Sequence, residues 1–232
     1  MEHLSKPIDA DNPFLGKSAD QFGYVVPDLE QAIKDWIDQG VGPWFTAGPV
    51  VVTDYKYLEK PSRPLLVFGF CQVGGVQLEL IQPLDDEPSS YRAFLAAGRS
   101  GFQHCGFFVE PHDYQRSVAQ AKASGATIQQ MMSFSGAHIA YFFLPARIGS
   151  PMERIRLGEV APEKANAVGN SVAGGCEIGE LLEFQPRTRE MYAKVAQAAA
   201  TWDGKARPVR HLLGPVAEAA IGSRLLRTVR IR

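Results

Sequence analysis

Four polar side chains of this chain together offer the donor atoms of a metal site. Glu79 lies within an otherwise apolar segment of β-type pattern, and Glu153 lies within a second segment of β-type pattern. A buried carboxylate is costly unless it is paired or binds an ion, and one divalent cation would neutralise both carboxylates. Gln21 and His104 add an amide oxygen and an imidazole nitrogen. This donor set without sulfur suits five- or six-coordinate Zn²⁺, Ni²⁺, Co²⁺, Mn²⁺ or Mg²⁺, with positions left open for water or substrate oxygens.

An internal repeat predicts which structural elements carry these residues. A strand, a turn and an apolar-periodic helix begin at Gln21, and the same pattern begins again 83 residues later at His104. Three segments of alternating, β-type pattern follow each helix. They cover residues 50–53, 65–72 and 76–81 in the first half, and 128–133, 139–144 and 152–157 in the second. Each half is therefore predicted to be a βαβββ unit.

The symmetry of the repeat predicts that the four side chains meet. Successive side chains of a strand point to opposite faces, so Gln21 and His104 face away from the helices of their halves. If a pseudo-twofold axis relates the halves, Gln21 is the mate of His104, and Glu79 is the mate of Glu153. All four side chains then converge on the axis. The alternative interpretation is that each is isolated: a Glu in solvent, a satisfied core His and a Gln at a strand edge.

These elements predict an α+β fold in which two tandem βαβββ modules form a cupped mixed sheet around a metal site. We expect one domain over residues 19–158, with module one at 19–83 and module two at 102–158. Residues 159–232 are expected to form a basic, mainly helical extension, with helices over 187–201 and 209–226. From residue 186 onward, ten Lys and Arg stand against three Asp and Glu. We expect this part to pack against the acidic remainder or a neighbouring subunit and to help close the cleft.

The composition is that of an ordinary globular protein. Of the 232 residues, 45 % are hydrophobic and 21 % are charged, and the formal net charge is -1. This balance argues against nucleic acid and anionic membrane as partners. The sequence shows no apolar stretch of signal-peptide or membrane-spanning length, so we expect a cytoplasmic protein. Its three cysteines form no Cys-x-x-Cys pair, which argues against a disulfide framework or a thiolate zinc site.

Two βαβββ halves with polar residues at these places resemble the vicinal oxygen chelate superfamily. This superfamily includes glyoxalase I, methylmalonyl-CoA epimerase, extradiol dioxygenases and bleomycin-resistance proteins. The resemblance covers about residues 19–158, and the stretches 77–84 and 101–109 are most similar to the epimerase branch. It implies that the metal ligands are Gln21, Glu79, His104 and Glu153. Gln21 stands where that epimerase usually has His, and the resulting set resembles eukaryotic-type glyoxalase I, in which the last Glu can leave the metal and act as the base.

The resemblance implies a metal-dependent isomerase, epimerase or lyase that acts on a small carbonyl compound or an acyl thioester. Such an enzyme removes a proton from the carbon next to a carbonyl and stabilises the enolate with the ion. Glu153 is the first candidate for the base and Glu79 the second. We also expect a homodimer. The alternatives are a bleomycin-resistance-like protein that binds a small molecule without turnover, and an extradiol-type dioxygenase, which Gln21 disfavours because the Fe(II) triad needs a second His.

Three further residues are candidates for the pocket wall. His138 precedes an alternating strand and could act as an acid or base, although a strand-edge His is commonly just a polar residue. Tyr141 could donate to a substrate oxygen or pack against a helix. Trp44 follows the first helix, near the expected mouth of the pocket. A serine or cysteine hydrolase is not expected, because the sequence has no Gly-x-Ser-x-Gly motif and His112 has no evident nucleophile partner.

Overall fold

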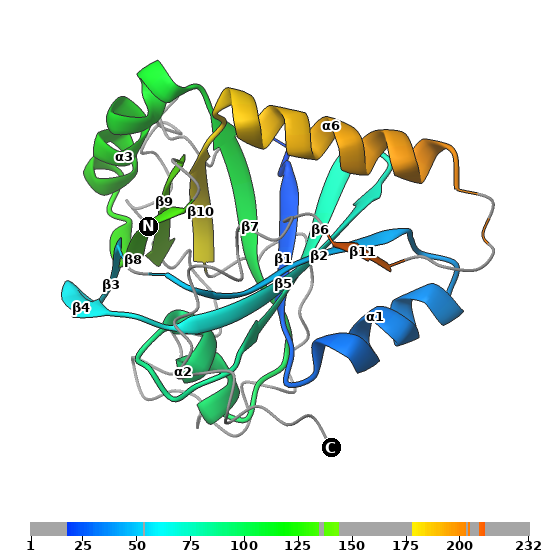
Figure 1. Ribbon diagram of the computed structural model, residues 1–232. Helices are drawn as coiled ribbons and strands as arrows, with labels where there is room; N and C mark the ends of the chain where they lie inside the picture. The colour runs from blue at the N-terminus through cyan, green and yellow to red at the C-terminus, as the bar shows by residue number, and fades with distance from the viewer. Residues whose placement is uncertain are drawn as a thin grey trace, which may run out of the picture.

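A single curled sheet dominates the computed structural model, which describes residues 18–52, 54–134, 137–143, 178–202, 204 and 209–211 (Figure 1). The sheet has 11 strands in the order β11-β2-β5-β6-β1-β7-β10-β9-β8-β3-β4. In chain order the strands are β1 (Gln21–Val25), β2 (Trp44–Val51), β3 (Asp54–Tyr57), β4 (Lys60–Ser62), β5 (Leu65–Val73), β6 (Val76–Pro83), β7 (Gly101–Val109), β8 (Thr127–Phe134), β9 (Ala137–Phe143), β10 (Ile178–Glu183) and β11 (Val209–His211). The helices are α1 (Leu29–Asp38), α2 (Ser90–Ala96), the short 3-10 helix η1 (Pro111–Asp113), α3 (Tyr114–Ala123) and α6 (Pro186–Ala200).

The sheet consists of two halves of the same topology, which confirms the prediction of two βαβββ modules in an α+β fold. The first half has the order β2-β5-β6-β1 and the second has β8-β9-β10-β7. In each half the first strand runs parallel to the last, as β1 does with β6 and β7 does with β10. The halves meet where β1 pairs antiparallel with β7. This pairing lies on the expected pseudo-twofold axis.

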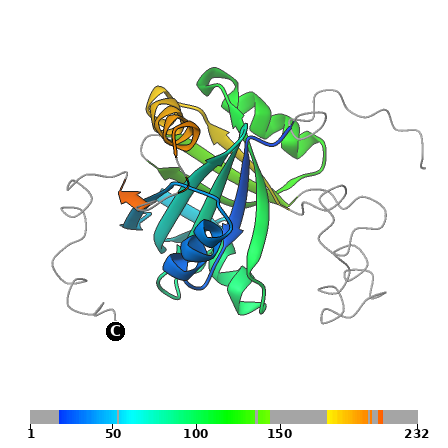
Figure 2. The ribbon, with the colours of Figure 1, turned by 90° about the vertical axis from the view of Figure 1, so that its right-hand side faces the viewer.

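The helices α1 and α3 cover the outer face of their halves (Figure 2). Asp28 caps α1 by accepting a hydrogen bond from the backbone N–H of Gln31 at 2.9 Å. Leu29 and Ile33 of α1 then pack in one apolar cluster with residues of β2, β5 and β6. The α3 helix packs in the same way against β7, β9 and β10 in a second cluster. Because apolar packing occupies the outer face, the inner face of the curl is left for a site.

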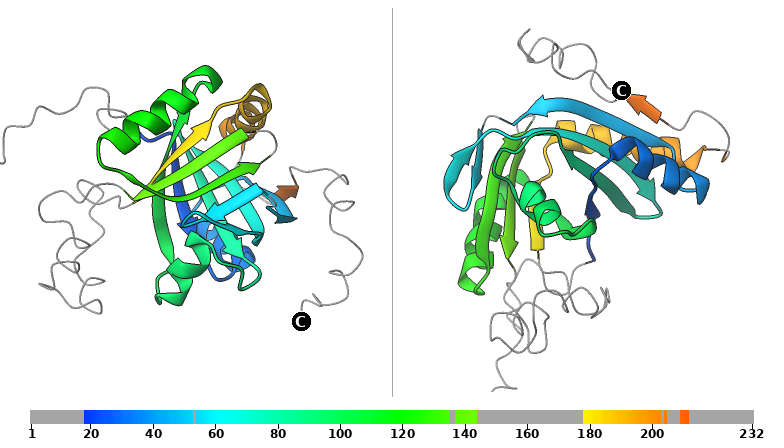
Figure 3. Two further views of the ribbon diagram at one scale, coloured as in Figure 1. Left: turned by 90° about the vertical axis from the view of Figure 1, so that its left-hand side faces the viewer. Right: turned by 90° about the horizontal axis from the view of Figure 1, so that it is seen from below.

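Two helices close the ends of the curled sheet (Figure 3). Tyr91 and Phe94 of α2 are buried in the core of the curl at one end, and Ser89 caps this helix by accepting from the N–H of Arg92 at 3.0 Å. At the other end α6 crosses the ends of β7, β1 and β6 (Figure 1). No helix in the described ranges is long and apolar enough to cross a membrane.

The second half and the extension differ from the expected element boundaries. The strand expected over residues 152–157 lies outside the described residues. Instead, β10 comes from the expected extension and lies in the sheet between β7 and β9. The expected helix at 209–226 was wrong at its start, because Val209–His211 is the strand β11, which pairs with the free edge of β2. The rest of that segment lies outside the described residues. The hairpin of β3 and β4, which was not predicted, extends the far edge beyond β8.

Candidate metal centre

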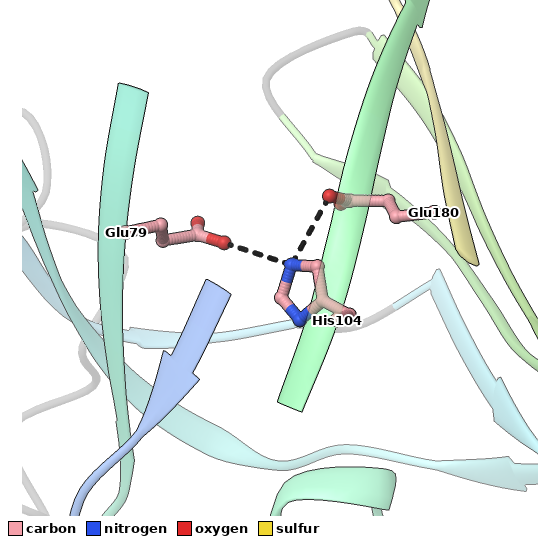
Figure 4. A group of neighbouring side chains, drawn as sticks. All are labelled: Glu79, His104 and Glu180. Atoms are coloured by element: carbon pink, nitrogen blue, oxygen red, sulfur yellow. Dashed lines mark ion pairs between the residues drawn. The ribbon is translucent and has the colours of Figure 1, made fainter. Parts of the chain in front are cut away.

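Three titratable side chains from neighbouring strands meet on the inner face of the sheet. Glu79 of β6 and Glu180 of β10 point from two sides toward the imidazole of His104 on β7 (Figure 4). The Nε2 atom of His104 lies 3.5 Å from Oε2 of Glu79 and 3.2 Å from Oε2 of Glu180. All three residues are buried, with exposed fractions of 7 %, 0 % and 3 % for Glu79, His104 and Glu180. One ligand atom from each lies within 4.8 Å of the others.

The pairing of the strands explains why these residues converge. Glu79 lies opposite Gly23 in the parallel pair of β6 and β1, and Glu180 lies opposite Gly106 in the parallel pair of β10 and β7. Gly23 and Gly106 are 83 residues apart and are therefore mates in the repeat. Glu180 is thus the pseudo-symmetric mate of Glu79.

The two glycines provide the room for the site. A Cβ atom added to Gly23 would lie 2.1 Å from Nε2 of His104. One added to Gly106 would lie 2.8 Å from Oε2 of Glu180 and 2.9 Å from Oε1 of Gln21. Any larger residue at these positions would enter the space where the polar side chains gather.

Gln21 joins the cluster from β1. Its Nε2 donates to Oε1 of Gln77 at 2.9 Å, which leaves its own Oε1 without a hydrogen-bond partner among the described residues. The structure therefore brings together three of the four residues predicted from the sequence, namely Gln21, Glu79 and His104. Glu153, the fourth, lies outside the described residues, and Glu180 lies in the place expected for it.

Gln103 fixes the tautomer of His104. Nδ1 of His104 lies 3.0 Å from Oε1 of Gln103, whose Nε2 donates to the backbone oxygen and the hydroxyl of Ser90 at 3.3 and 3.4 Å. Since that amide oxygen can only accept, Nδ1 carries a proton, so Nε2 is the nitrogen whose lone pair would bind a cation in the cluster. Gln103 can reach His104 because the strand register skips it: Gly23 pairs with His104, and the next residue, Tyr24, pairs with Phe102. Gln103 is the extra residue of a β-bulge, and a bulge re-aims a side chain in this way.

The electrostatics of the cluster favour a cation between the carboxylates. Burial lowers the pKa of His104, but the carboxylates of Glu180 and Glu79 outweigh it and raise that pKa to about 10. Burial raises the pKa of Glu79 to about 7, and the imidazole of His104 opposes this shift. One proton on the imidazole still leaves an uncompensated negative charge in a buried place when both carboxylates are ionised. A divalent cation balances both carboxylates.

The unpaired atoms of the cluster fit such a cation. Four buried atoms on the inner face lack a hydrogen-bond partner among the described residues: Gln21 Oε1, Glu79 Oε2, His104 Nε2 and Glu180 Oε2. Buried polar atoms without a partner are rare in folded proteins. An imidazole nitrogen with three oxygen atoms is a donor set for a borderline or hard divalent ion. The residues present therefore fit a divalent metal ion.

The cluster forms one end of a cavity of about 290 Å³. Gln21, Gln77, Glu79 and Glu180 line it at the metal end, and side chains of α6 line it at the other. Apolar side chains make up much of the wall, among them Phe70, Phe108, Phe134, Ile139, Leu182 and Met191. The cavity has the dimensions and lining of a site for a small molecule.

The α6 helix is fixed over the cavity from both sides. Tyr192 accepts a hydrogen bond from Nε2 of Gln72 at 2.9 Å and donates to the backbone oxygen of Gly75 at 3.1 Å. Arg189 pairs with Glu110 and stacks on Phe184, with its guanidinium carbon 4.4 Å from the ring centroid. The expectation that the segment after residue 186 packs on the core and helps close the cleft therefore agrees with the placement of α6.

The three additional pocket candidates lie elsewhere. Nδ1 of His138 lies 2.7 Å from Oε2 of Glu183, and this pair packs beside Tyr114 of α3, on the outer face. Tyr141 is buried behind the cluster, with its ring centroid 4.8 Å from that of His104, and its hydroxyl accepts from Tyr91 at 3.0 Å. Trp44 is fully buried among the residues that pack on α1. None of the three lines the described cavity.

Glu180 was not predicted as a site residue, although the sequence around it resembles the sequence around Glu79. Residues 179–183 read Gly-Glu-Leu-Leu-Glu, and residues 78–82 read Leu-Glu-Leu-Ile-Gln. In both strands the Glu is followed by a fully buried aliphatic residue, Leu80 or Leu181. Glu153 is followed by Arg154 instead. A charged side chain at the position of Leu80 would face the apolar outer layer, so this comparison favours Glu180 as the mate of Glu79.

We predict that Gln103 contributes to metal affinity without touching the metal. Replacing Gln103 by Leu removes the acceptor for Nδ1–H of His104, so the affinity for Zn²⁺ should fall by about 10–100-fold. Gln103→Glu keeps an acceptor and should retain most of that affinity. Competition with a fluorescent chelator measures both values. Wild-type affinity in the Gln103→Leu protein would contradict the prediction.

The comparisons with known proteins agree with this architecture. The family model described as "Glyoxalase/Bleomycin resistance protein/Dioxygenase superfamily" matches residues 20–143, which is more than half of the chain. No curated protein matches the sequence.

Solved structures show a weak likeness. A hypothetical protein from Bacillus halodurans is 15 % identical, with a TM-score of 0.42, over 72 % of this chain and 94 % of its own. Methylmalonyl-CoA epimerase from Mycobacterium tuberculosis is 18 % identical, with a TM-score of 0.38, over 74 % of this chain and 91 % of its own. A variant of the Streptomyces coelicolor epimerase in complex with 2-nitronate-propionyl-CoA is 15 % identical, with a TM-score of 0.36, over 71 % of this chain and 95 % of its own.

Proposed function

Because the chain belongs to the glyoxalase/bleomycin resistance protein/dioxygenase superfamily, we propose that it is a metal-dependent isomerase, epimerase or lyase. Its substrate would be a small carbonyl compound or acyl thioester, from which it removes a proton on the carbon next to the carbonyl. One observation carries the proposal. Four buried atoms that can ligate a metal lack hydrogen-bond partners among the described residues, and they gather beside a cavity large enough for a small substrate.

In this proposal Gln21, Glu79, His104 and Glu180 hold the ion. A divalent cation bound there supplies a Lewis acid that polarises a substrate carbonyl and so acidifies the neighbouring C–H. Gln77 orients the amide of Gln21, and Gln103 orients the imidazole of His104. These hydrogen bonds keep the donor atoms directed at one place.

Glu180 is the proposed base. Its carboxylate lines the cavity next to the apolar side chain of Leu182, so it reaches the substrate as well as the cluster. The resemblance to eukaryotic-type glyoxalase I favours the glutamate of the last strand of module two, and β10 is that strand in the described structure. The α6 helix covers the cavity and limits access of water, which favours proton transfer between the substrate and the carboxylate.

Metal analysis and proton exchange test the function. Protein purified without chelator should carry about one divalent ion per chain, and chelation should abolish exchange of a carbon-bound proton with solvent. Proton NMR in deuterated water reports this exchange with a 2-oxoaldehyde hemithioacetal or an α-branched acyl thioester. His104→Ala should lose the ion, whereas His138→Ala should keep it, because His138 lies on the outer face.

Three outcomes would contradict the proposal. Protein that carries no ion and is not stabilised by added metals has no metal site. Tight binding of a compound that is never altered indicates a binding protein without turnover. Oxygen consumption with a catechol indicates a dioxygenase.

A further inference from the structure

An unpaired hydrogen-bond donor lies beside the proposed metal site. Gln77 of β6 is 2 % exposed and lines the cavity, and its Nε2 has no hydrogen-bond partner among the described residues. Nearly all buried amide N–H groups in folded proteins are paired. An unpaired one on a cavity wall is therefore available to a ligand.

The orientation of this amide follows from the cluster. A cation between Glu79 and Glu180 requires that Gln21 present its oxygen, so Nε2 of Gln21 must be the atom that faces Gln77. Oε1 of Gln77 accepts that hydrogen bond at 2.9 Å. With its oxygen engaged, Gln77 has only N–H to offer to the cavity.

The neighbour across the strands does not occupy this donor. Gln72 of β5 lies directly opposite Gln77 in the antiparallel pair of β5 and β6. Its Nε2 donates to Tyr192 and to the backbone oxygen of Gly74. Its Oε1 has no hydrogen-bond partner among the described residues, so the two amides do not bond to each other. Of the two, only Gln77 lines the cavity.

We propose that Gln77 donates a hydrogen bond to a substrate oxygen beside the metal site, so that the cavity selects an apolar compound with a hydrogen-bond acceptor next to the oxygen that meets the metal. This inference rests on the proposed function for the presence of the metal. The cavity wall also includes the aromatic side chains of Phe70, Phe108 and Phe134. An aryl or alkyl group packs against these side chains, while the acceptor oxygen meets the N–H of Gln77. The equivalent position in module two is Ile178, which has no side-chain hydrogen-bond donor. Of this pair of positions, only the one in module one can therefore donate a hydrogen bond to the substrate.

Benzohydroxamate is a suitable probe because it has two neighbouring oxygens and an aryl group. Titration calorimetry with the Zn²⁺-loaded full chain measures its affinity. Gln77→Glu keeps the acceptor for Gln21 but replaces the donor by an anionic oxygen. This change should lower the affinity for benzohydroxamate by about 10–100-fold, as expected for the loss of a hydrogen bond to a charged group. The affinity for Zn²⁺ should not fall.

Two further variants keep the test decisive. Gln77→Met removes the donor without adding charge, but it also removes the acceptor for Gln21. Its affinity for benzohydroxamate is therefore compared at saturating Zn²⁺, where it should again be lower than that of the wild type, which keeps the test available if Gln77→Glu does not fold. Gln129→Glu places the same change at another buried Gln, outside the cavity, and should leave the affinity unchanged.

The outcomes separate this inference from the proposed function. A wild-type chain that binds no Zn²⁺ overturns the proposed function. A chain that binds Zn²⁺ overturns only the role of Gln77 if it binds no benzohydroxamate, or if the Gln77 variants bind it as tightly as the wild type does.

Discussion

Replacing Glu180 by Gln is expected to slow exchange of the carbon-bound proton by about 10²–10⁴-fold, the range typical for removal of a general base. Gln keeps the shape of Glu and one oxygen donor, so much of the bound metal should remain, but an amide cannot take up the proton. Proton NMR in deuterated water gives the exchange rate, and elemental analysis of the same sample gives the metal content. The two readings together separate loss of the base from loss of the ion.

Two matched variants identify which glutamate acts. Glu183→Gln changes another buried carboxylate of β10, which lies on the outer face beside His138. It should leave the exchange rate within about twofold, because Glu183 does not line the cavity. Glu153→Gln tests the residue predicted first from the sequence. Full exchange in the Glu180→Gln protein, together with its loss in the Glu153→Gln protein, would return the role of the base to Glu153.

The fold and most of the cluster could be predicted because they depend on local patterns that the two halves share. Alternation of side chains marks strands such as β6, and the repeat at Gln21 and His104 places two strands on one axis. The inner-face position of Glu79 follows from the same alternation. These features depend on short-range sequence periodicity, which a single sequence displays.

Other parts depend on long-range pairing, which periodicity does not encode. Residues 144–177 separate β9 from β10. The sequence predicts Glu153 as the mate of Glu79, because residues 152–157 form the next segment of β-type pattern after β9. Only the pairing of β10 with β7 identifies Glu180 as that mate. The role of Gln103 depends on a β-bulge, since strict alternation would point it away from His104.

Gly23→Ala is expected to lower the affinity for Zn²⁺ by at least about 100-fold, comparable to the largest losses seen when a supporting partner of a ligand is removed. The added Cβ would lie 1.8 Å from Cε1 and 2.1 Å from Nε2 of His104. The imidazole is a rigid ring and its residue is fully buried, so it must rotate away from Glu79 and Glu180. Rotation also breaks the hydrogen bond of Nδ1 with Gln103. Overpacking of this kind typically lowers the free energy of unfolding by about 1–3 kcal/mol.

Two other glycines provide graded controls for this prediction. Gly106→Ala would meet the ends of the Glu180 and Gln21 side chains at 2.8 and 2.9 Å, and because these ends can shift, the loss of affinity should be smaller than for Gly23→Ala. Gly75 lies in the turn between β5 and β6, where an added Cβ meets nothing within 4 Å. Gly75→Ala should therefore change neither the affinity for Zn²⁺ nor the free energy of unfolding. Competition with a chelator measures the affinity, and urea denaturation measures the free energy of unfolding. Equal Zn²⁺ affinity in the Gly23→Ala and Gly75→Ala proteins would show that the ion is not held by the imidazole of His104.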